Sequence, residues 1–287
     1  MSTNITRKSV FTILKAVAIT IAAAFIVISI LYPSRKRSTL EMDDLPVVFK
    51  NKDVVFHALD EHTWVGSGHQ VYNEAVYLVE GEEKALLIDA GYKIPHLDEI
   101  VATITDKPVT LALTHNHTDH VGAAKCFDEL WVGDQGGEQK IKGFRGEVKY
   151  LHHLQLIDLG GRVLEVFNAP GHTAESVIFV DKENNYGFSG DAFGSTNLLM
   201  TQKMSTFLKT AEDTYDMMEE MDIRFFYPGH FGGQNVETME RVADLRTIAE
   251  DVLSGKVEGK RTAGAEGLNR VVSYNGARLT YNSRKVE

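Results

Sequence analysis

Runs of apolar residues, alternating or continuous, predict strands over 54–59, 75–79, 85–88, 109–113, 163–167, 177–180 and 187–188. Polar turn residues predict hairpins at 80–82 and 183–185, and Asn275 and Gly276 close a last hairpin between 271–274 and 278–281. Apolar residues near helical spacing predict helices over 96–103, 211–221 and 236–253, with another beginning at Asp119. Strands in two groups along the sequence, with helices between and after them, predict an α+β sandwich.

The stretch from Val10 to Tyr32 is almost wholly apolar and has no polar face to show to water. Its length suits a helix across the ~30 Å hydrocarbon core of a bilayer, and Lys15 can reach the interface from within it. We therefore expect an N-terminal transmembrane helix. A cleaved signal peptide is the alternative, but this apolar run is longer than the usual ~7 to 15 residues.

Three segments follow from this interpretation: a tail and membrane anchor over 1–33, a polar tether over 34–46, and a globular domain over 47–287. Basic residues flank the apolar run on both sides, so the positive-inside rule gives no clear orientation. We expect a single-pass anchor with the globular domain on the extracytoplasmic side.

Composition narrows the classes of function. The 287 residues are 43% hydrophobic, which is enough to bury a large core. The formal net charge of −10 argues against a nucleic-acid partner, because phosphate binding relies on clustered Lys and Arg. The single cysteine, Cys126, excludes an intramolecular disulfide and any cysteine-based zinc cluster.

The segment from Thr114 to His120 contains three histidines and an aspartate directly after an apolar strand. His115 and His117 lie two positions apart on an extended segment, so both imidazoles can face one ion. Asp119 and His120 follow where the chain turns into a helix and can face a neighbouring ion. The alternative is a solvated loop with structural histidines.

Three later segments also end strands with a polar side chain. Pro-Gly turns precede His172 and His230, and Gly190 precedes Asp191. Loops at strand ends are where a rigid scaffold presents ligands, although each segment taken alone also fits an ordinary turn.

Together these segments resemble the metallo-β-lactamase superfamily, whose pattern is His-x-His-x-Asp-His followed by a histidine, an aspartate and a histidine at later strand ends. The resemblance covers nearly all of 47–282 and implies a four-layer αβ/βα sandwich with two metal ions at one edge. The implied ligands are His115, His117 and His172 on one ion, Asp119, His120 and His230 on the other, and Asp191 bridging. Asp89, which follows the strand 85–88, matches an aspartate that supports the site in this family.

The resemblance and the chemistry of the ligands predict a dinuclear zinc hydrolase that acts on a small ester-like substrate, a thioester or a lactone. Zinc lowers the pKa of bound water to ~7, so a metal-bridging hydroxide would serve as the nucleophile. Asp119 is the expected catalytic residue, passing a proton to the leaving group. The aspartate at position 191 is typical of thioesterases of the glyoxalase II kind, lactonases and phosphodiesterases, and argues against a true β-lactamase.

Two alternatives use the same ligands: an iron-dependent oxidoreductase similar to persulfide dioxygenases, and a phosphodiesterase. Iron or manganese can replace zinc in such a site. Trp64, Tyr72 and Asn73 are candidate substrate contacts, with packing as the alternative role. Phe231 stands where glycine is frequent in the family. The remaining histidines are expected to be structural: His57, His62, His69, His96, His152 and His153.

Overall fold

The computed structural model describes residues 44–141, 143–194, 197–233 and 235–287, which fall within one unit, Glu41–Glu287. The predicted membrane anchor over 1–33 and most of the tether lie outside the described residues. Among the helices of the described ranges, none combines the length and the apolar character that crossing a bilayer requires.

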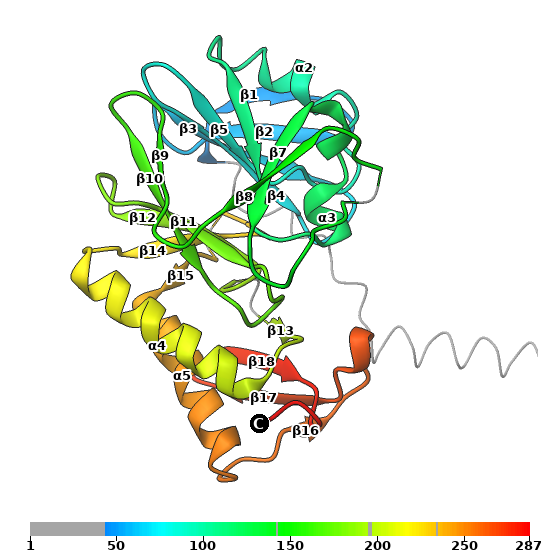
Figure 1. Ribbon diagram of the computed structural model, residues 1–287, viewed down its shortest axis with the longest axis vertical. Coiled ribbons are helices and arrows are strands. Elements are labelled where there is room, and N and C mark those ends of the chain that lie inside the picture. The colour runs from blue at the N-terminus through cyan, green and yellow to red at the C-terminus, as the bar shows by residue number, and fades with distance from the viewer. Residues whose placement is uncertain (1–43, 142, 195–196, 234) are drawn as a thin grey trace, which may run out of the picture. The chain divides into compact units, whose positions relative to one another are not determined.

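An eight-stranded sheet contains the first strands of the unit in sequence order (Figure 1). These strands are β1 (Val47–Lys50), β2 (Val54–Ala58), β3 (Thr63–Gly68), β4 (Ala75–Glu80), β5 (Ala85–Ile88), β6 (Val109–Ala112), β7 (Glu129–Gly133) and β8 (Glu147–Leu151). Pairing is antiparallel as far as β5 and parallel from β5 to β8. The carboxyl ends of β5 and β6 therefore lie at the same edge of the sheet.

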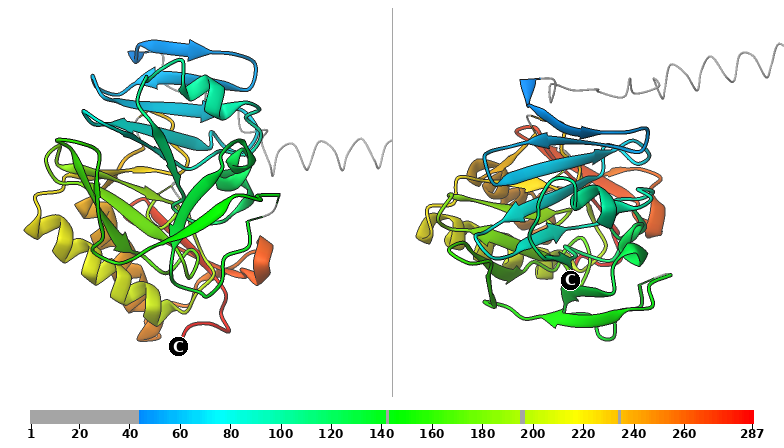
Figure 2. Two further views of the ribbon diagram at one scale, coloured as in Figure 1. Left: turned by 45° about the horizontal axis from the view of Figure 1, so that its top comes forward. Right: turned by 90° about the horizontal axis from the view of Figure 1, so that it is seen from above.

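A six-stranded sheet faces the first one, as the two views of Figure 2 show. Its order is β15 (Glu237–Thr238), β14 (Phe225–Pro228), β12 (Tyr186–Gly190), β11 (Val177–Asp181), β10 (Val163–Asn168) and β9 (Leu156–Asp158). β11 is antiparallel to both β10 and β12, and β12 is parallel to β14. β10, β12 and β14 consequently run in one direction and end at one edge.

Helices lie on the outer side of each sheet. The first sheet carries α2 (Leu97–Val101), α3 (Thr118–Val121) and the 3-10 turn η2 (Ala124–Cys126), and the second carries α4 (Met204–Glu220) and α5 (Met239–Leu253). A four-stranded sheet packs against α5; its order is β13 (Leu198–Met200), β18 (Ala277–Tyr281), β17 (Arg270–Tyr274) and β16 (Lys260–Arg261). The 3-10 turn η3 (Ala265–Gly267) connects β16 to β17.

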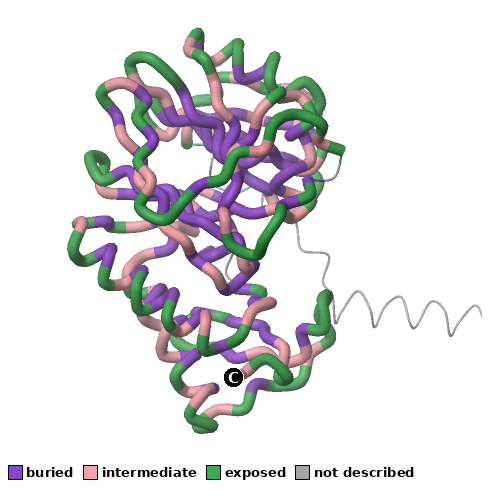
Figure 3. Tube along the Cα trace, in the orientation of Figure 1, coloured by how far each residue is buried: buried purple, intermediate pink, exposed green. Residues whose placement is uncertain are grey.

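Three apolar clusters fill the spaces between these layers, and buried residues follow the strands through the middle of the protein (Figure 3). One cluster lies between the two large sheets and includes Tyr77, Phe179 and Phe188. The other two lie between each sheet and its helices, with Ile100 and Phe207 among their members. The α+β sandwich expected from the sequence is therefore confirmed.

The predicted strands and hairpins match β2, β4 to β6, β10 to β12, β17 and β18. The helix predicted over 211–221 begins earlier, at Met204, because Met204 and Phe207 continue its buried face. β3 was missed because its glycines and serine break the apolar pattern. Gly66 is needed there, since a Cβ would lie 2.5 Å from the Phe56 ring. Trp64, the candidate substrate contact on this strand, packs in the cluster beneath the helices of the first sheet.

Candidate metal centre

The predicted ligands all follow strand ends at one edge of the sandwich. His115 comes shortly after β6, and His172, Asp191 and His230 follow β10, β12 and β14. β6 belongs to the first sheet, while β10, β12 and β14 belong to the second. Two sheets that face each other thus present their loops to the same space.

The seven predicted ligand side chains meet in three overlapping groups, in each of which the ligand atoms lie within 4.8 Å of one another. The groups are His115, His117 and His172; His115, His120 and Asp191; and Asp119, His120 and His230. Asp191 lies centrally, with its carboxylate 3.7 Å from His120 Nε2, 3.7 Å from His172 Nε2 and 3.4 Å from His230 Nε2. This is the place that a bridging carboxylate would occupy.

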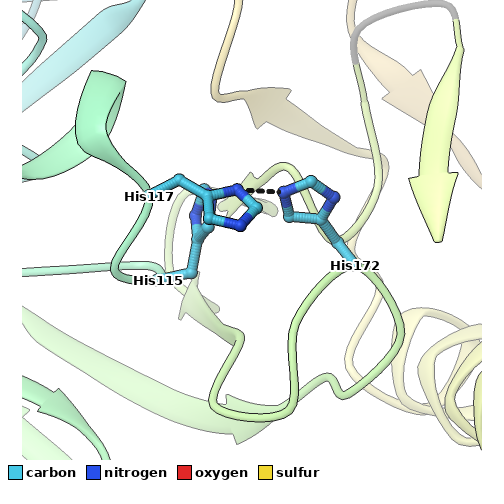
Figure 4. Close-up of side chains that lie close together, drawn as sticks. All are labelled: His115, His117 and His172. Atoms are coloured by element: carbon cyan, nitrogen blue, oxygen red, sulfur yellow. Dashed lines mark hydrogen bonds between the residues drawn. The ribbon is translucent and has the colours of Figure 1, made fainter. Parts of the chain in front are cut away.

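Figure 4 shows the rings of His115 and His117 facing that of His172 across a short gap. His117 Nδ1 and His172 Nε2 are 2.9 Å apart. The outer ring nitrogen of His172, Nδ1, donates to the Leu199 carbonyl at 2.5 Å. A neutral imidazole with its outer nitrogen protonated has a lone pair on its inner nitrogen, which is the form that binds a metal.

The same arrangement recurs at the other buried histidines. The Thr114 hydroxyl donates to Asp89 at 2.8 Å, so it accepts from His115 Nδ1 at 3.1 Å. His120 Nδ1 donates to the same Asp89 carboxylate at 2.8 Å. Asp89, buried after β5, therefore fixes the rings of His115 and His120 so that both Nε2 atoms face inward. This agrees with the supporting role expected from the sequence.

Glycines let the strand ends approach this closely. A Cβ on Gly229 would lie 2.4 Å from Asp191 Oδ1 and 2.7 Å from His120 Cε1. A Cβ on Gly190 would lie 2.3 Å from Thr114 Oγ1. The glycine before His230 and the one before Asp191 are thus required by the distance between the two sheets, beyond any need of the turns.

The donor set fits divalent cations. His115 Nε2, His120 Nε2 and Asp191 Oδ1 are buried without a hydrogen-bond partner among the described residues. Burying such atoms unpaired costs ~1–3 kcal/mol each, unless an ion binds them. Imidazoles and carboxylates are ligands for zinc, iron and manganese alike, so the chemistry of the donors is compatible with each of these ions.

Charges within the cluster are strongly coupled. Burial opposes protonation of His120, but Asp89 and Asp191 together raise the pKa of His120 to about 9. Burial, with His120 and His172 beside it, lowers the pKa of His115 well below its usual value. For Asp191, burial alone would raise the pKa, yet His230 and His120 hold it well below its usual range. The carboxylates of Asp89 and Asp191 therefore favour positive charge at this end of the cluster.

Exposure distinguishes the outer side of the cluster from its base. The His120 side chain is 0% exposed, whereas Asp119 is 20% and His117 is 30% exposed. A substrate would therefore approach past Asp119 and His117.

Sequence reasoning missed a group of side chains that fixes the loop between His115 and His117. The Asn116 backbone amide donates to Glu175 at 3.2 Å, and its side-chain amide donates to Gln139 at 2.6 Å. Glu175 is buried and follows His172 by three positions, so it links the two ligand loops. A charged residue two positions before the apolar run 177–180 was the available signal.

The other candidates differ in position. Tyr72 is 75% exposed and precedes Glu74, which forms an isolated bridge with His230, so it remains a candidate contact. Phe231 is buried between the sheets and packs edge-on against Tyr227 at 5.3 Å. The six remaining histidines take no part in the three ligand groups.

Sequence comparison relates this chain to a known family. Residues 69–230 match the model described as the metallo-beta-lactamase superfamily. Acyl-coenzyme A thioesterase MBLAC2 of Homo sapiens is 24% identical over 213 residues, which cover 58% of this chain and 76% of that protein. Hydroxyacylglutathione hydrolase of Xanthomonas euvesicatoria is 28% identical over 124 residues, covering 41% and 45%.

Solved structures share the fold. The metallo-beta-lactamase from Pontibacter korlensis superimposes with a TM-score of 0.55 at 14% sequence identity, covering 69% of this chain and 100% of that one. The match to the family model spans more than half of the chain and includes all seven predicted ligands. The resemblance noted from the sequence is thereby confirmed, and the chain belongs to the metallo-beta-lactamase superfamily.

Proposed function

We propose that this chain is a dinuclear zinc hydrolase that cleaves a small thioester or lactone. The single observation that carries the proposal is the convergence of five imidazoles and two carboxylates, with their inner nitrogens directed at common points. Asp191 supports two ions over one, because its carboxylate lies between the two histidine groups. The names of the thioesterase and hydrolase relatives support the reaction class.

The ligands divide between two positions. His115, His117 and His172 would hold one cation, and Asp119, His120 and His230 the other, with Asp191 shared. When bound, the two cations would supply an activated water at neutral pH and would stabilise negative charge that develops on the substrate.

The chain's own residues have three tasks in this reaction. Asp89 holds His115 and His120 in the tautomer with inward lone pairs. Asp119 stands at the exposed side with its Oδ2 3.6 Å from His230 Nε2, where it can accept the proton that the attacking water loses and pass it to the leaving group. His120 and Asp89, which are 0% and 2% exposed, close the cluster on the side opposite the substrate.

The proposal is tested by removing the metal and then removing a ligand. The full chain is treated with a chelator, reloaded with Zn²⁺, and assayed with an acyl-coenzyme A thioester and a simple lactone. We expect hydrolysis to disappear and return. Loss of a group that only supports a metal ligand costs about 10–100-fold, so His172→Ala should cost on the order of 100-fold or more.

His96→Ala is the matched control, because His96 is 72% exposed and pairs only with Glu99 on its own helix turn among the described residues. The H96A variant should hydrolyse both substrates at the rate of the wild type. Hydrolysis that survives complete metal removal, or an H172A variant as active as H96A, would contradict the proposal. Tight retention of a single iron on purification, with oxygen consumption in place of hydrolysis, would favour the oxidoreductase alternative.

A further inference from the structure

The four-stranded sheet at the C-terminal side contacts two of the three histidines in the first ligand group. Its edge strand β13 offers the Leu199 carbonyl to His172 Nδ1. The turn η3, between β16 and β17, brings Glu266 Oε1 to 3.8 Å from His117 Nε2. Both contacts are made to the outer ring nitrogens, since His117 Nδ1 and His172 Nε2 face each other (Figure 4).

The backbone at Glu266 is held in a conformation that favours glycine. Its φ is 57° and its ψ is 23°, inside a turn closed by hydrogen bonds from Gly264 N to the Leu268 carbonyl and from Leu268 N to the Ala265 carbonyl. A side chain in the left-handed region carries strain, and such residues concentrate where a ligand is clamped. The turn alone gives no reason for a glutamate at this position, but the contact with His117 does.

A carboxylate on the outer nitrogen of a metal-binding imidazole fixes its tautomer and ring orientation and makes the inner nitrogen a stronger ligand. The Leu199 carbonyl stands in that relation to His172 through a hydrogen bond, and the Glu266 carboxylate lies at ion-pair distance, 3.8 Å, from the outer nitrogen of His117. His117 has particular need of such support, because its side chain is the more exposed of the two, at 30% against 4%.

Strand pairing connects the turn that carries Glu266 to the loop that carries His172. Leu199 pairs with Thr280 of β18, and β18 pairs with β17, which follows η3. Thr201, directly after β13, donates its hydroxyl to the His172 carbonyl at 2.6 Å. The sheet that carries Glu266 is therefore bonded to the loop that carries His172. Strands β16 to β18 lie beyond residue 230, where the match to the family model ends.

We propose that Glu266 is a positioning residue that orients His117 for metal binding, so that the C-terminal sheet forms part of the metal centre. This inference rests on the proposed metal site. It assigns to the segment 260–281 a role in holding the cation, in addition to covering the helices.

The test measures Zn²⁺ affinity of the full chain by competition with a chromophoric chelator, with no activity assay. Glu266→Gln removes the charge, and Glu266→Gly also relieves the strained backbone. Both should weaken Zn²⁺ binding about 10-fold, the lower end of the effect for groups that support a ligand. In the metal-free protein, Glu266→Gly should melt at the same temperature as the wild type or higher, since glycine accepts a φ of 57°.

Glu258→Gln is the matched control: it removes another carboxylate, just before the segment 260–281, that is 76% exposed and pairs with Arg270. It should leave the affinity unchanged. Wild-type affinity in E266Q would overturn the positioning role, as would an equal loss in E258Q accompanied by a lower melting temperature. If the wild type itself takes up no Zn²⁺, the proposed function fails, and this inference fails with it.

Discussion

Replacing Arg162 should destabilise the protein more than any surface change, because its guanidinium is buried between the two large sheets. Arg162 is 8% exposed, and its ion-pair partner Asp181 is 0% exposed. Nε donates to Asp181 at 2.7 Å, and Nη2 donates to Thr63 and Tyr186 at 2.9 Å each. Nη1 donates to the backbone carbonyls of His62 and Glu80 at 3.0 and 3.2 Å.

Arg162→Met keeps most of the apolar volume but removes every donor in this set. Asp181 would keep the two Asn184 amides, at 3.2 and 2.9 Å, and would remain a buried charge without its counter-ion. Removing one partner of a buried ion pair costs about 3–5 kcal/mol. The double variant R162M/D181N should recover about 1–3 kcal/mol of that loss, because it also removes the unpaired charge.

Urea denaturation of the metal-free protein measures these free energies of unfolding. Trp64, which follows Thr63, is one of only 2 tryptophans and provides a fluorescence signal beside the network. Lys209→Met, which removes an exposed pair with Asp213, is the control and should leave the midpoint unchanged. A loss below about 1 kcal/mol in R162M, or a double variant no more stable than R162M, would refute the argument.

Two further predictions concern single buried groups. Gly229→Ala should weaken Zn²⁺ binding about 10–100-fold and lower the free energy of unfolding by about 1–3 kcal/mol, because the new methyl group would overlap Asp191 and His120. Chelator competition measures the affinity and thermal melting measures the stability. An unchanged Zn²⁺ affinity would contradict the predicted overlap. Burial raises the pKa of Glu237 despite the opposing effect of Arg241, so protonation of Glu237 is more favourable in the folded than in the unfolded state. Its contribution to stability is therefore full below its unfolded pKa and decreases as pH rises through the folded value. Glu237→Gln should gain stability relative to the wild type between pH 4 and pH 7 in urea titrations, and a difference that is constant with pH would rule this out.

Local patterns in the sequence predicted the parts of the site that depend on strand ends. The turn before His172 and the glycine before Asp191 placed both residues at strand ends, because apolar runs ending in Pro-Gly or Gly indicate where a strand stops. Family resemblance then grouped the ligands. The structure brings the seven side chains together in three overlapping groups, one of which joins His115 to His120 and so crosses that division.

Contacts between distant segments could not be predicted in this way. Glu266 and Leu199 face the metal histidines only because β13 joins a sheet with strands from the end of the chain. Arg162 follows a glycine pair, and no pattern around it predicts that it is buried between the two large sheets. Such positions depend on tertiary packing, which periodicity along one segment does not record.

The division of the ligands between two sheets has a consequence for the order of assembly. Three histidines and Asp119 come from the first half of the domain, whereas His172, Asp191 and His230 come from strands made later. A nascent chain with only the first sheet offers an incomplete shell, which holds an ion weakly. At the proposed metal site, tight binding of a cation therefore requires that the two halves are docked, and a chain in which they separate would release the ion.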